Sequence, residues 1–402
     1  MTQFSLLQRN LLILLTGILI ISITIFRSEW FWIMGWIGIW VYNLSIPFGV
    51  LLINYGLCRL IGLRWYIGVS ILGVAESVLL SIFLGISIFQ PSQFPKLHLI
   101  KNVYTDIHNT TQYDTSLSQF DSELGYLYRP NIKGVFKNWE FGPNTYTTNK
   151  LGLRDDSASA NAPTIITLGD SFTTGWGVEQ DETYADRLEK LLGVKVLNAG
   201  ISSYGTIREG ILLKKLPLDS CKLIILQYCY NDIAENKEWS DSLLQGNSYK
   251  PSFGREAFLN RQIQNQAGNM YVPFKYLFQI SKKMGMFMFL KPEQHDPYAK
   301  HESNSTQEHM FYFFESLKLI RKSFKGNIIV ISTSNSPRLD SEFIQKSNTY
   351  AHRHNLTHLF FIDFNDLFTS KDNYLIDGHT TASGHLIIAK QLYRVIKTKQ
   401  LI

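Results

Sequence analysis

Hydrophobic positions are concentrated in the first ninety residues, in three long runs that contain almost no charge. The first run ends at Arg27, the second is free of charge, and the third contains only Glu76. Each run is close to or longer than the roughly 20 residues that an apolar helix needs to cross a bilayer. A signal peptide is the alternative for the first run, but no small-residue cleavage site follows it and the next run begins almost at once. We therefore expect residues 1–93 to form a membrane anchor of about three helices, at 10–27, 30–57 and 65–90.

The arginines between the runs predict the orientation of this anchor. With three spans, one side of the membrane carries Arg9, Arg59 and Arg64, and the other side carries Arg27. Because basic residues are enriched on the cytoplasmic side, the N-terminus is expected there and the chain after the third run outside. Pro47, inside the second run, leaves open a re-entrant break that would reverse this result. The pattern thus favours the cell (inner) membrane, with the remaining chain extracytoplasmic.

Glu76 lies near the middle of the third run. An ionisable residue inside a membrane segment is by default a candidate for function. The alternative is a carboxyl group hydrogen-bonded to Asn43 or Asn54 on the neighbouring span. We favour this structural interpretation because no second ionisable residue accompanies Glu76 in its run.

After a polar linker at 94–117 the pattern changes twice. Residues 118–156 are β-like and rich in turn residues, which predicts short strands or hairpins. From residue 164 onward, short apolar runs alternate with segments of helical periodicity. The expected strands are 164–168, 194–198, 223–228, 327–332 and 359–363. The expected helices are 183–192, 207–216, 310–324, 341–354 and 383–397, and an insert at 233–308 interrupts the alternation. This order predicts a three-layer α/β/α sandwich with a five-stranded parallel sheet, in one domain over residues 118–402.

Composition and charge exclude several classes of function. The net charge is +6, but no block of Lys and Arg of the kind that follows phosphates is present, so nucleic-acid binding is not expected. Three cysteines cannot build a disulfide framework. His352 and His354 do not share a helix face, and no carboxylate is in register with them or with His358, so we expect no metal site. No other cofactor is expected, and the sequence does not indicate an oligomeric state.

Groups suited to nucleophilic catalysis or to binding an oxyanion follow four of the expected strands. The first strand ends at Gly169-Asp170-Ser171, which presents a hydroxyl at the carboxyl edge of the sheet, where ligands bind in open α/β folds. A loop after the last strand carries Asp377 and His379, a base and a group that orients it. The third strand is followed by Asn231, and the loop after the second strand could aim a backbone N–H at the same edge. We interpret Asp170 as a structural cap, and His385 as a packing residue.

These stretches resemble the sequence blocks of the SGNH (GDSL) hydrolase superfamily, in the order that the family has along the chain. The resemblance covers residues 163–396, and the 148–155 stretch resembles the lead-in of membrane-tethered members. It implies a flavodoxin-like fold in which Ser171 is the nucleophile, His379 the general base and Asp377 the acidic member of the triad. The oxyanion hole would consist of the Ser171 and Ser203 backbone N–H groups and the Asn231 side chain.

Two positions depart from the family pattern. Ser203 stands where the family has a glycine, which is tolerable if its backbone conformation is permissive, because the contact is made by the N–H group. Asp377 lies two residues before His379, whereas many members have three.

The expected activity is therefore that of a membrane-anchored serine esterase. It would cleave ester-linked acyl groups, with acetyl the first choice, from a cell-surface glycan or a lipid. An O-acyltransferase that modifies an extracytoplasmic polysaccharide with the same triad is the first alternative. A catalytically inactive SGNH-like domain that binds glycan is the second. Substrate choice is expected to reside in the insert, whose Met- and Phe-rich stretch could cover the site, meet the membrane interface or form a packed helix pair.

Overall fold

The structure is a computed structural model, and it describes residues 5–26, 35–62, 65, 67–75, 78–79, 110–136, 143–244, 254–268, 306–334, 337–369, 371–373 and 378–402. Glu76, Asp377 and the Met- and Phe-rich stretch of the insert lie outside these residues. The chain divides into two compact units. The first comprises Met1–Thr110 and Leu259–Lys291, and the second comprises Thr111–Phe258 and Pro292–Ile402.

In the first unit, two long apolar helices pack closely against each other: α1 (Leu6–Phe26) and α3 (Gly35–Leu60). Glycine permits the close approach, because a Cβ added to Gly17 would lie 2.7 Å from the carbonyl oxygen of Gly49. Among the described residues, one helix is long and apolar enough to cross a membrane, Leu6–Thr24, and Pro47–Leu60 is a shorter apolar helix. This finding is compatible with a membrane anchor, while the three-span topology stays a prediction.

The second unit contains the predicted parallel sheet. Its strands are β5 (Ile165–Leu168), β6 (Val196–Asn198), β7 (Leu223–Tyr228), β8 (Asn327–Ser332) and β9 (Leu359–Phe361). They are hydrogen-bonded in the order β6-β5-β7-β8-β9, and every pair is parallel. This confirms the predicted five-stranded sheet, and its order is the flavodoxin-like 2-1-3-4-5. The strand order reverses between β5 and β7, and ligands bind at the carboxyl ends of strands at such a point.

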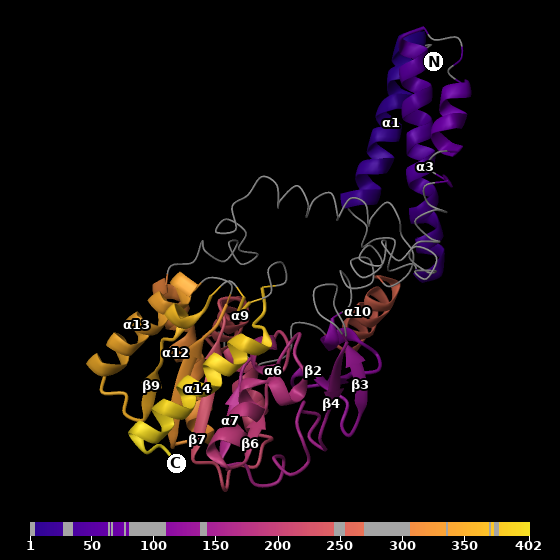
Figure 1. Cartoon of the computed structure of the whole chain (residues 1–402). Helices are drawn as coiled ribbons and strands as arrows, with labels where there is room; N and C mark the ends of the chain where they lie inside the picture. Colours follow the sequence, from indigo (N-terminus) through magenta and orange to yellow (C-terminus); the bar gives the residue numbers. More distant parts are fainter. Residues whose placement is uncertain are drawn as a thin grey trace. The chain divides into compact units, whose positions relative to one another are not determined.

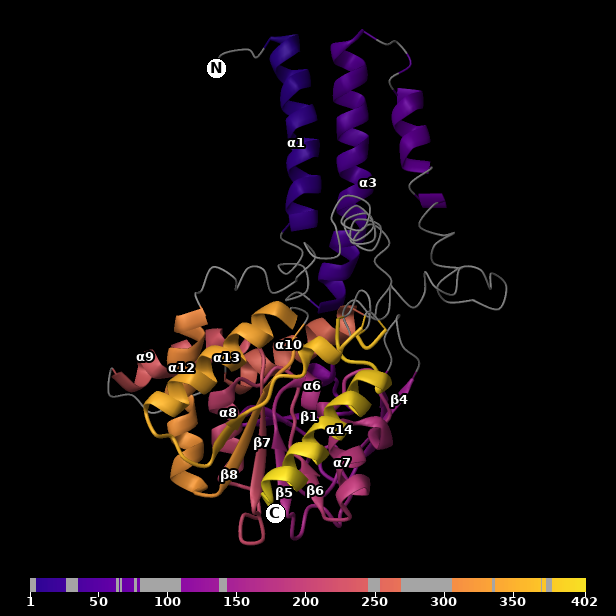
Figure 2. The same ribbon diagram turned by 60° about the vertical axis from the view of Figure 1, so that its left-hand side comes forward.

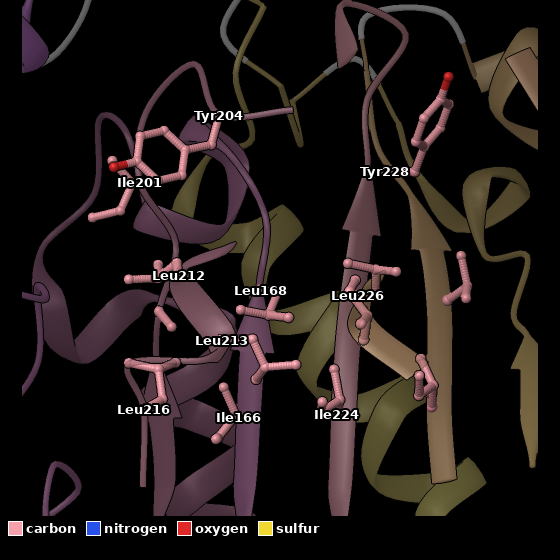
Figure 3. Close-up of a cluster of buried hydrophobic side chains, with 14 of the residues drawn as sticks. Ile166, Leu168, Ile201, Tyr204, Leu212, Leu213, Leu216, Ile224, Leu226 and Tyr228 are labelled. Carbon is pink, nitrogen blue, oxygen red and sulfur yellow. The ribbon is translucent and has the colours of Figure 1, made fainter. Parts of the chain in front are cut away.

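Helices cover both faces of the sheet (Figures 1 and 2). One face carries α7 (Tyr184–Leu192) and α14 (Ala382–Lys399), and the other carries α8 (Thr206–Leu213), α12 (Thr306–Ser323) and α13 (Pro337–Arg353). Both faces of β7 are buried: Leu223 and Ile225 pack toward α7 and α14, whereas Ile224 and Leu226 pack toward α8 (Figure 3). Continuous apolar strands of this kind are typical of a parallel sheet with helices on both faces.

The beginning of the predicted insert belongs to these layers. Residues 232–244 form α9 (Asp232–Leu244), which packs against α8 and α12. A further helix, α10 (Arg255–Gly268), follows, and α12 begins at Thr306, inside the range predicted for the insert. Residues 269–305 lie outside the described part of the chain.

The segment before the sheet forms two antiparallel hairpins, as the turn-rich pattern predicts. The first pairs β1 (Ser118–Asp121) with β2 (Gly125–Tyr128), and the second pairs β3 (Lys133–Phe136) with β4 (Asn144–Thr147). The described residues of this unit also include the short 3-10 helices η2 (Thr111–Tyr113), η3 (Gln180–Glu182) and η5 (Asn365–Leu367).

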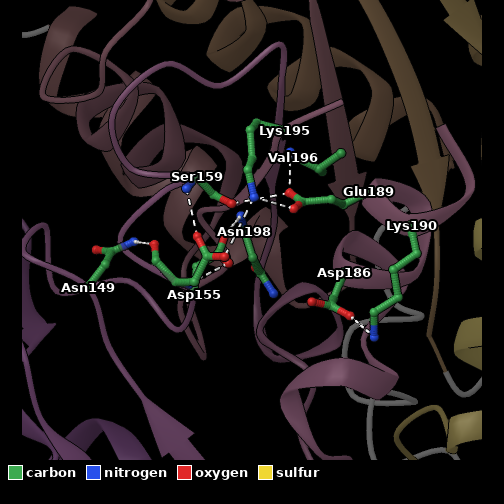
Figure 4. A network of polar contacts seen from close by, with 10 residues as sticks. Asn149, Asp155, Ser159, Asp186, Glu189, Lys190, Lys195, Val196 and Asn198 are labelled. Atoms are coloured by element: carbon green, nitrogen blue, oxygen red, sulfur yellow. Dashed lines mark hydrogen bonds and ion pairs between the residues drawn. The ribbon is translucent and has the colours of Figure 1, made fainter. Parts of the chain in front are cut away.

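The hairpin segment is attached to the sheet edge by a buried carboxylate. Asp155 accepts a hydrogen bond of 2.7 Å from the backbone N–H of Asn198, at the end of β6 (Figure 4). Burial raises the pKa of Asp155 to about 8, although the N–H groups of Asn198 and Asp156 act in the opposite direction. The hairpin segment is therefore held at the end of β6, where the loop begins that is predicted to contribute a backbone N–H to the oxyanion hole.

Candidate active site

The turn after β5 presents Ser171 as the first residue of the short helix α6 (Ser171–Thr174). Gly169 has φ 157°, and a Cβ at this position would lie 2.1 Å from Thr173 Oγ1. The Asp170 carboxylate caps the helix by accepting a 3.0 Å hydrogen bond from the N–H of Phe172, and the Asp170 N–H donates to Gln227 Oε1 of β7. Asp170 therefore has the capping role that its position predicts, and the turn holds Ser171 at the carboxyl edge of the sheet.

His379 lies beside this serine, although 208 positions separate the two in the sequence. Ser171 Oγ and His379 Nε2 are 2.7 Å apart, which is a hydrogen-bond distance for a nucleophile and its base. The Ser171 side chain is mostly buried but keeps 8% of its surface exposed. The structure thus brings together the two residues that the sequence predicts as nucleophile and base.

The loop that carries His379 is closed at its base by Asp372. Asp372 accepts hydrogen bonds from the hydroxyl of Ser383 (2.6 Å) and from the N–H and hydroxyl of Thr369, and its carbonyl accepts the N–H of Thr381. Burial acts to raise the pKa of Asp372, but the bonds from Ser383 and Thr369 outweigh it, so the pKa is lowered. A charged carboxylate therefore fixes both ends of the loop.

Among the described residues, the rings of Phe172 and Trp176 contact the imidazole of His379. Phe172 of α6 has its ring centroid 4.8 Å from that of His379, with the planes inclined by 32°. Trp176 lies 5.4 Å away at 31°. The sequence patterns do not identify either ring as part of the site. Phe172 and Trp176 follow the nucleophile in the sequence but are far from His379 in it, so only the tertiary structure shows the contact.

Asn231 is placed beside the nucleophile turn, at the end of β7. Its Nδ2 lies 3.5 Å from Asp170 Oδ2, which is a long hydrogen bond. Burial raises the pKa of Asp170, while the hydrogen bond from Phe172 and the charge of His379 act to lower it. The Asp170 carboxylate thus accepts hydrogen bonds both from Asn231, a predicted oxyanion donor, and from the first turn of α6, which begins at the predicted nucleophile.

Ser203 adopts the backbone conformation in which a glycine would be unstrained. Its φ is 63°, in the left-handed region. The preceding loop lies against the nucleophile turn, because the N–H of Ile201 donates to the carbonyl of Gly169 at 3.0 Å. The guanidinium of Arg208 holds this loop by donating to the Ser203 carbonyl, and it forms a bidentate pair with Glu235 at 2.6 and 2.9 Å. The departure from glycine is therefore compatible with the predicted role of the backbone.

Buried carboxyl groups lie below this edge of the sheet. Burial raises the pKa of Glu209 and of Asp232 well above their ordinary values. The charge of Asp232 acts in the same direction on Glu209, and the charge of Asp170 acts in the same direction on both. Within the described part of the chain, no group of three His, Cys, Asp or Glu residues is arranged to hold a metal ion.

His385 occupies a structural position. It accepts a hydrogen bond from the Tyr184 N–H through Nδ1 and stacks on the Tyr184 ring at an inclination of 19°. This agrees with the packing role that the sequence predicts for it.

Comparison with known proteins gives remote structural similarities. No protein-family model matches the sequence, and no curated protein is significantly similar to it. Among similar solved structures are lipolytic proteins of the G-D-S-L family from Veillonella parvula and Desulfitobacterium hafniense, at 15% and 11% identity and a TM-score of 0.34 each. They cover 58% and 57% of this chain and 97% and 98% of their own. A carbohydrate esterase is similar over 58% of this chain and 64% of its own, with 12% identity and a TM-score of 0.34.

At such low identities and TM-scores, the chemistry of this chain follows from its own side chains rather than from the superposition.

Proposed function

We propose that this chain is a serine esterase with Ser171 as nucleophile and His379 as general base. The observation that carries the proposal is the 2.7 Å contact between Ser171 Oγ and His379 Nε2 at the switch point of the sheet. A serine as a mere helix cap would not need an imidazole from a loop that distant in sequence. The same contact argues against an inactive binding domain, which has no use for an activated hydroxyl.

The reaction proceeds through an acyl-enzyme. Ser171 Oγ attacks the ester carbonyl while His379 Nε2 takes its proton, and the imidazolium then gives that proton to the departing alkoxide. Water attacks the acyl-enzyme, transfers a proton to His379 and releases the acid, and the proton returns to Ser171 Oγ. Asp377 would orient the imidazole.

The oxyanion would be bound by the Asn231 amide and the N–H groups of Ser171 and Ser203. Asn231 is held beside the turn by Asp170, and the loop at Ser203 is fixed by Arg208. Such preorganised donors typically contribute a few kcal/mol to transition-state binding.

The substrate we propose is an acyl ester, with acetyl first, on a cell-surface glycan or on a lipid. The argument is the location: apolar helices precede the domain, and the charge pattern around them predicts that it faces the outside of the cell. An O-acyltransferase would use the same serine and histidine, with a sugar hydroxyl in place of water, and is one outcome of the test below.

The test is covalent labelling followed by product analysis. The full-length protein in mild detergent should react with a fluorophosphonate at Ser171 and should hydrolyse p-nitrophenyl acetate. Ser171→Ala should lose both reactions while retaining its circular dichroism spectrum, and the control Ser323→Ala, at the end of α12, should lose neither. Absence of labelling in folded wild-type protein would disprove the proposal. Acylated glycan instead of free acid, when a glycan acceptor is added, would identify a transferase.

A further inference from the structure

Arg154 is a fully buried cation in the turn that leads from the β3–β4 hairpin to the sheet, with 0% of its surface exposed. Its guanidinium donates four hydrogen bonds, and all four go to backbone carbonyls. The acceptors are Thr174 (3.2 Å), Gly175 (2.6 Å), Thr145 (2.7 Å) and Val178 (2.8 Å). Three of these carbonyls lie at the last residue of α6 or in the segment directly after it, so a single side chain fixes the course of the chain from residue 174 to residue 178.

The segment that Arg154 holds carries Trp176. The carbonyls of Thr174 and Gly175 lie at the C-terminal end of α6, where a cation is favourable because the last carbonyls lack helical partners. Gly175 has φ 85°, a conformation that turns the chain directly after the helix. The Trp176 ring then packs between two partners that come from different parts of the chain. Its centroid lies 4.6 Å from that of Phe136 in β3 and 5.4 Å from that of His379.

The β3–β4 hairpin supports this arrangement in two further ways. The Arg154 guanidinium carbon lies 3.8 Å from the centroid of the Tyr146 ring in β4. The N–H of Thr145 donates to the carboxylate of Glu179, which follows the held segment. The hairpin and the nucleophile helix are therefore joined through Arg154, Trp176 and Glu179.

We propose that Arg154 and Trp176 are positioning residues for the base: Arg154 fixes the 174–178 segment, and the Trp176 ring holds the imidazole of His379 and stabilises its protonated form. This inference rests on the proposed esterase function, because it gives the imidazolium a role in turnover. An aromatic face near a cation attracts it through the ring quadrupole. His379 becomes a cation when it takes the proton of Ser171, so the contact is stronger at that stage than in the resting enzyme.

Other groups also act on the His379 ring. Within the described part of the chain, the charged or titratable groups with an electrostatic interaction with this ring include Asp170, on the turn before α6, and His385, in α14. Asp377 precedes it in the same loop, outside the described residues. Substitution of Trp176 leaves all three in place, and Arg154→Lys keeps the positive charge while it removes the planar fork that reaches several carbonyls at once.

The test compares Trp176→Leu with Trp176→Phe, which keeps an aromatic face, in the full-length protein in detergent. For Trp176→Leu, the acid limb of the pH profile of kcat/KM should move to lower pH by about half a unit, the size expected of one cation–π contact at a partly exposed site. Its kcat should fall by about two- to fivefold with little change in KM. Trp176→Phe should keep the acid limb and the kcat of the wild type. Arg154→Lys should show the same shift of the acid limb and the same fall in kcat as Trp176→Leu. The double variant, which combines Arg154→Lys with Trp176→Leu, should have a kcat within about twofold of that of Trp176→Leu alone.

Phe313→Leu is the matched control, because Phe313 is buried on α12 and its substitution weakens the core without touching the site. A merely structural role of Trp176 would lower the active fraction, as in the control, without moving the acid limb. Overlap of the Trp176→Leu and Phe313→Leu profiles would overturn the proposal. If the losses in kcat of the two single variants add up in the double variant, the role of Arg154 is overturned. If Arg154→Lys does not fold, the comparison of Trp176→Leu with Trp176→Phe still tests the role of Trp176.

A second measurement separates this inference from the proposed function. The titration of the His379 ring can be followed by NMR of ¹³Cε1-labelled histidine, with its signal assigned by its loss in His379→Gln. In Trp176→Leu and in Arg154→Lys, the His379 ring should titrate at lower pH than in the wild type, whether or not the protein hydrolyses esters. Failure of Ser171 labelling would refute the esterase alone, whereas unchanged titration of His379 would refute the positioning role alone.

Discussion

His385 provides a quantitative test of the packing near the candidate active site. Its ring is buried in α14, and its Nδ1 accepts a hydrogen bond from the Tyr184 N–H, so this nitrogen cannot carry a proton in the fold. The Tyr184 hydroxyl is in turn 2.8 Å from Thr173 Oγ1, which donates to Gln227 Oε1, the acceptor of the Asp170 N–H. The histidine is therefore the far end of a chain of contacts that reaches the nucleophile turn.

Burial first, and then the charges of Arg187 and Arg154, lower the pKa of His385 from 6.5 to about 3. Because the folded value lies below the unfolded one, the unfolded chain binds the proton first as the pH falls. The stability that neutral His385 contributes is thus complete above about pH 7 and is lost progressively below pH 6.5. At pH 5 the loss is about 2 kcal/mol, from about 1.5 pH units at about 1.4 kcal/mol each. This magnitude depends little on the folded pKa, provided that it stays well below 5.

The perturbation is His385→Asn, whose side-chain oxygen can accept from the Tyr184 N–H but does not titrate. At pH 7.5 the variant should be less stable than wild type, because part of the buried ring volume and the contact with Tyr184 are lost. Between pH 7.5 and pH 5 the difference between the two proteins should shrink by about 2 kcal/mol. Urea unfolding followed by tryptophan fluorescence at several pH values measures this difference.

His352→Asn, at an exposed position of α13, is the control and should follow the wild-type pH dependence. If the curves of wild type and His385→Asn stay parallel down to pH 5, His385 is not a buried neutral group and the reasoning is refuted.

Three substitutions at two positions address the predicted oxyanion hole. Ser203→Gly should retain kcat/KM and gain up to about 1 kcal/mol in unfolding free energy, since glycine adopts φ 63° without strain; Ser203→Val should lose about 1–2 kcal/mol at the same position. A loss of activity in Ser203→Gly would show that the hydroxyl, not the backbone, is needed. Asn231→Ala should lower kcat about 10²- to 10³-fold with little effect on KM, as measured with p-nitrophenyl acetate, because it removes a side-chain donor to the oxyanion. A decrease of less than about tenfold would remove Asn231 from that role.

The periodicity of the chain was sufficient to predict the sheet. Apolar runs that are long enough for a strand and too short for a helix alternate with helical segments. Strands that are apolar on both faces are typical of a parallel sheet, in which helices cover both faces. The strands at 223–228 and 327–332 have the predicted bounds. The helix bounds shift by a few residues, because caps and first turns depend on local hydrogen bonds such as that of Thr183 with Asp186.

The insert shows the limit of such patterns. Residues 232–244 lack a clear apolar periodicity, yet they form α9. This helix is stabilised by its contacts with α8 and α12, which are separated from it in the sequence. Tertiary packing therefore decides a helix that local preference leaves open.

The sequence predicts that Ser171, Asn231 and His379 share one site, because each follows a strand and all parallel strands end at one edge. The surroundings of the base depended on the tertiary structure. Phe172 and Trp176 are ordinary aromatic residues in the sequence, and Arg154 is one arginine among several. Only the fold brings the hairpin, the segment after α6 and the loop near the C-terminus to one imidazole, because contacts over such separations are set by the packing of whole elements and not by local pattern.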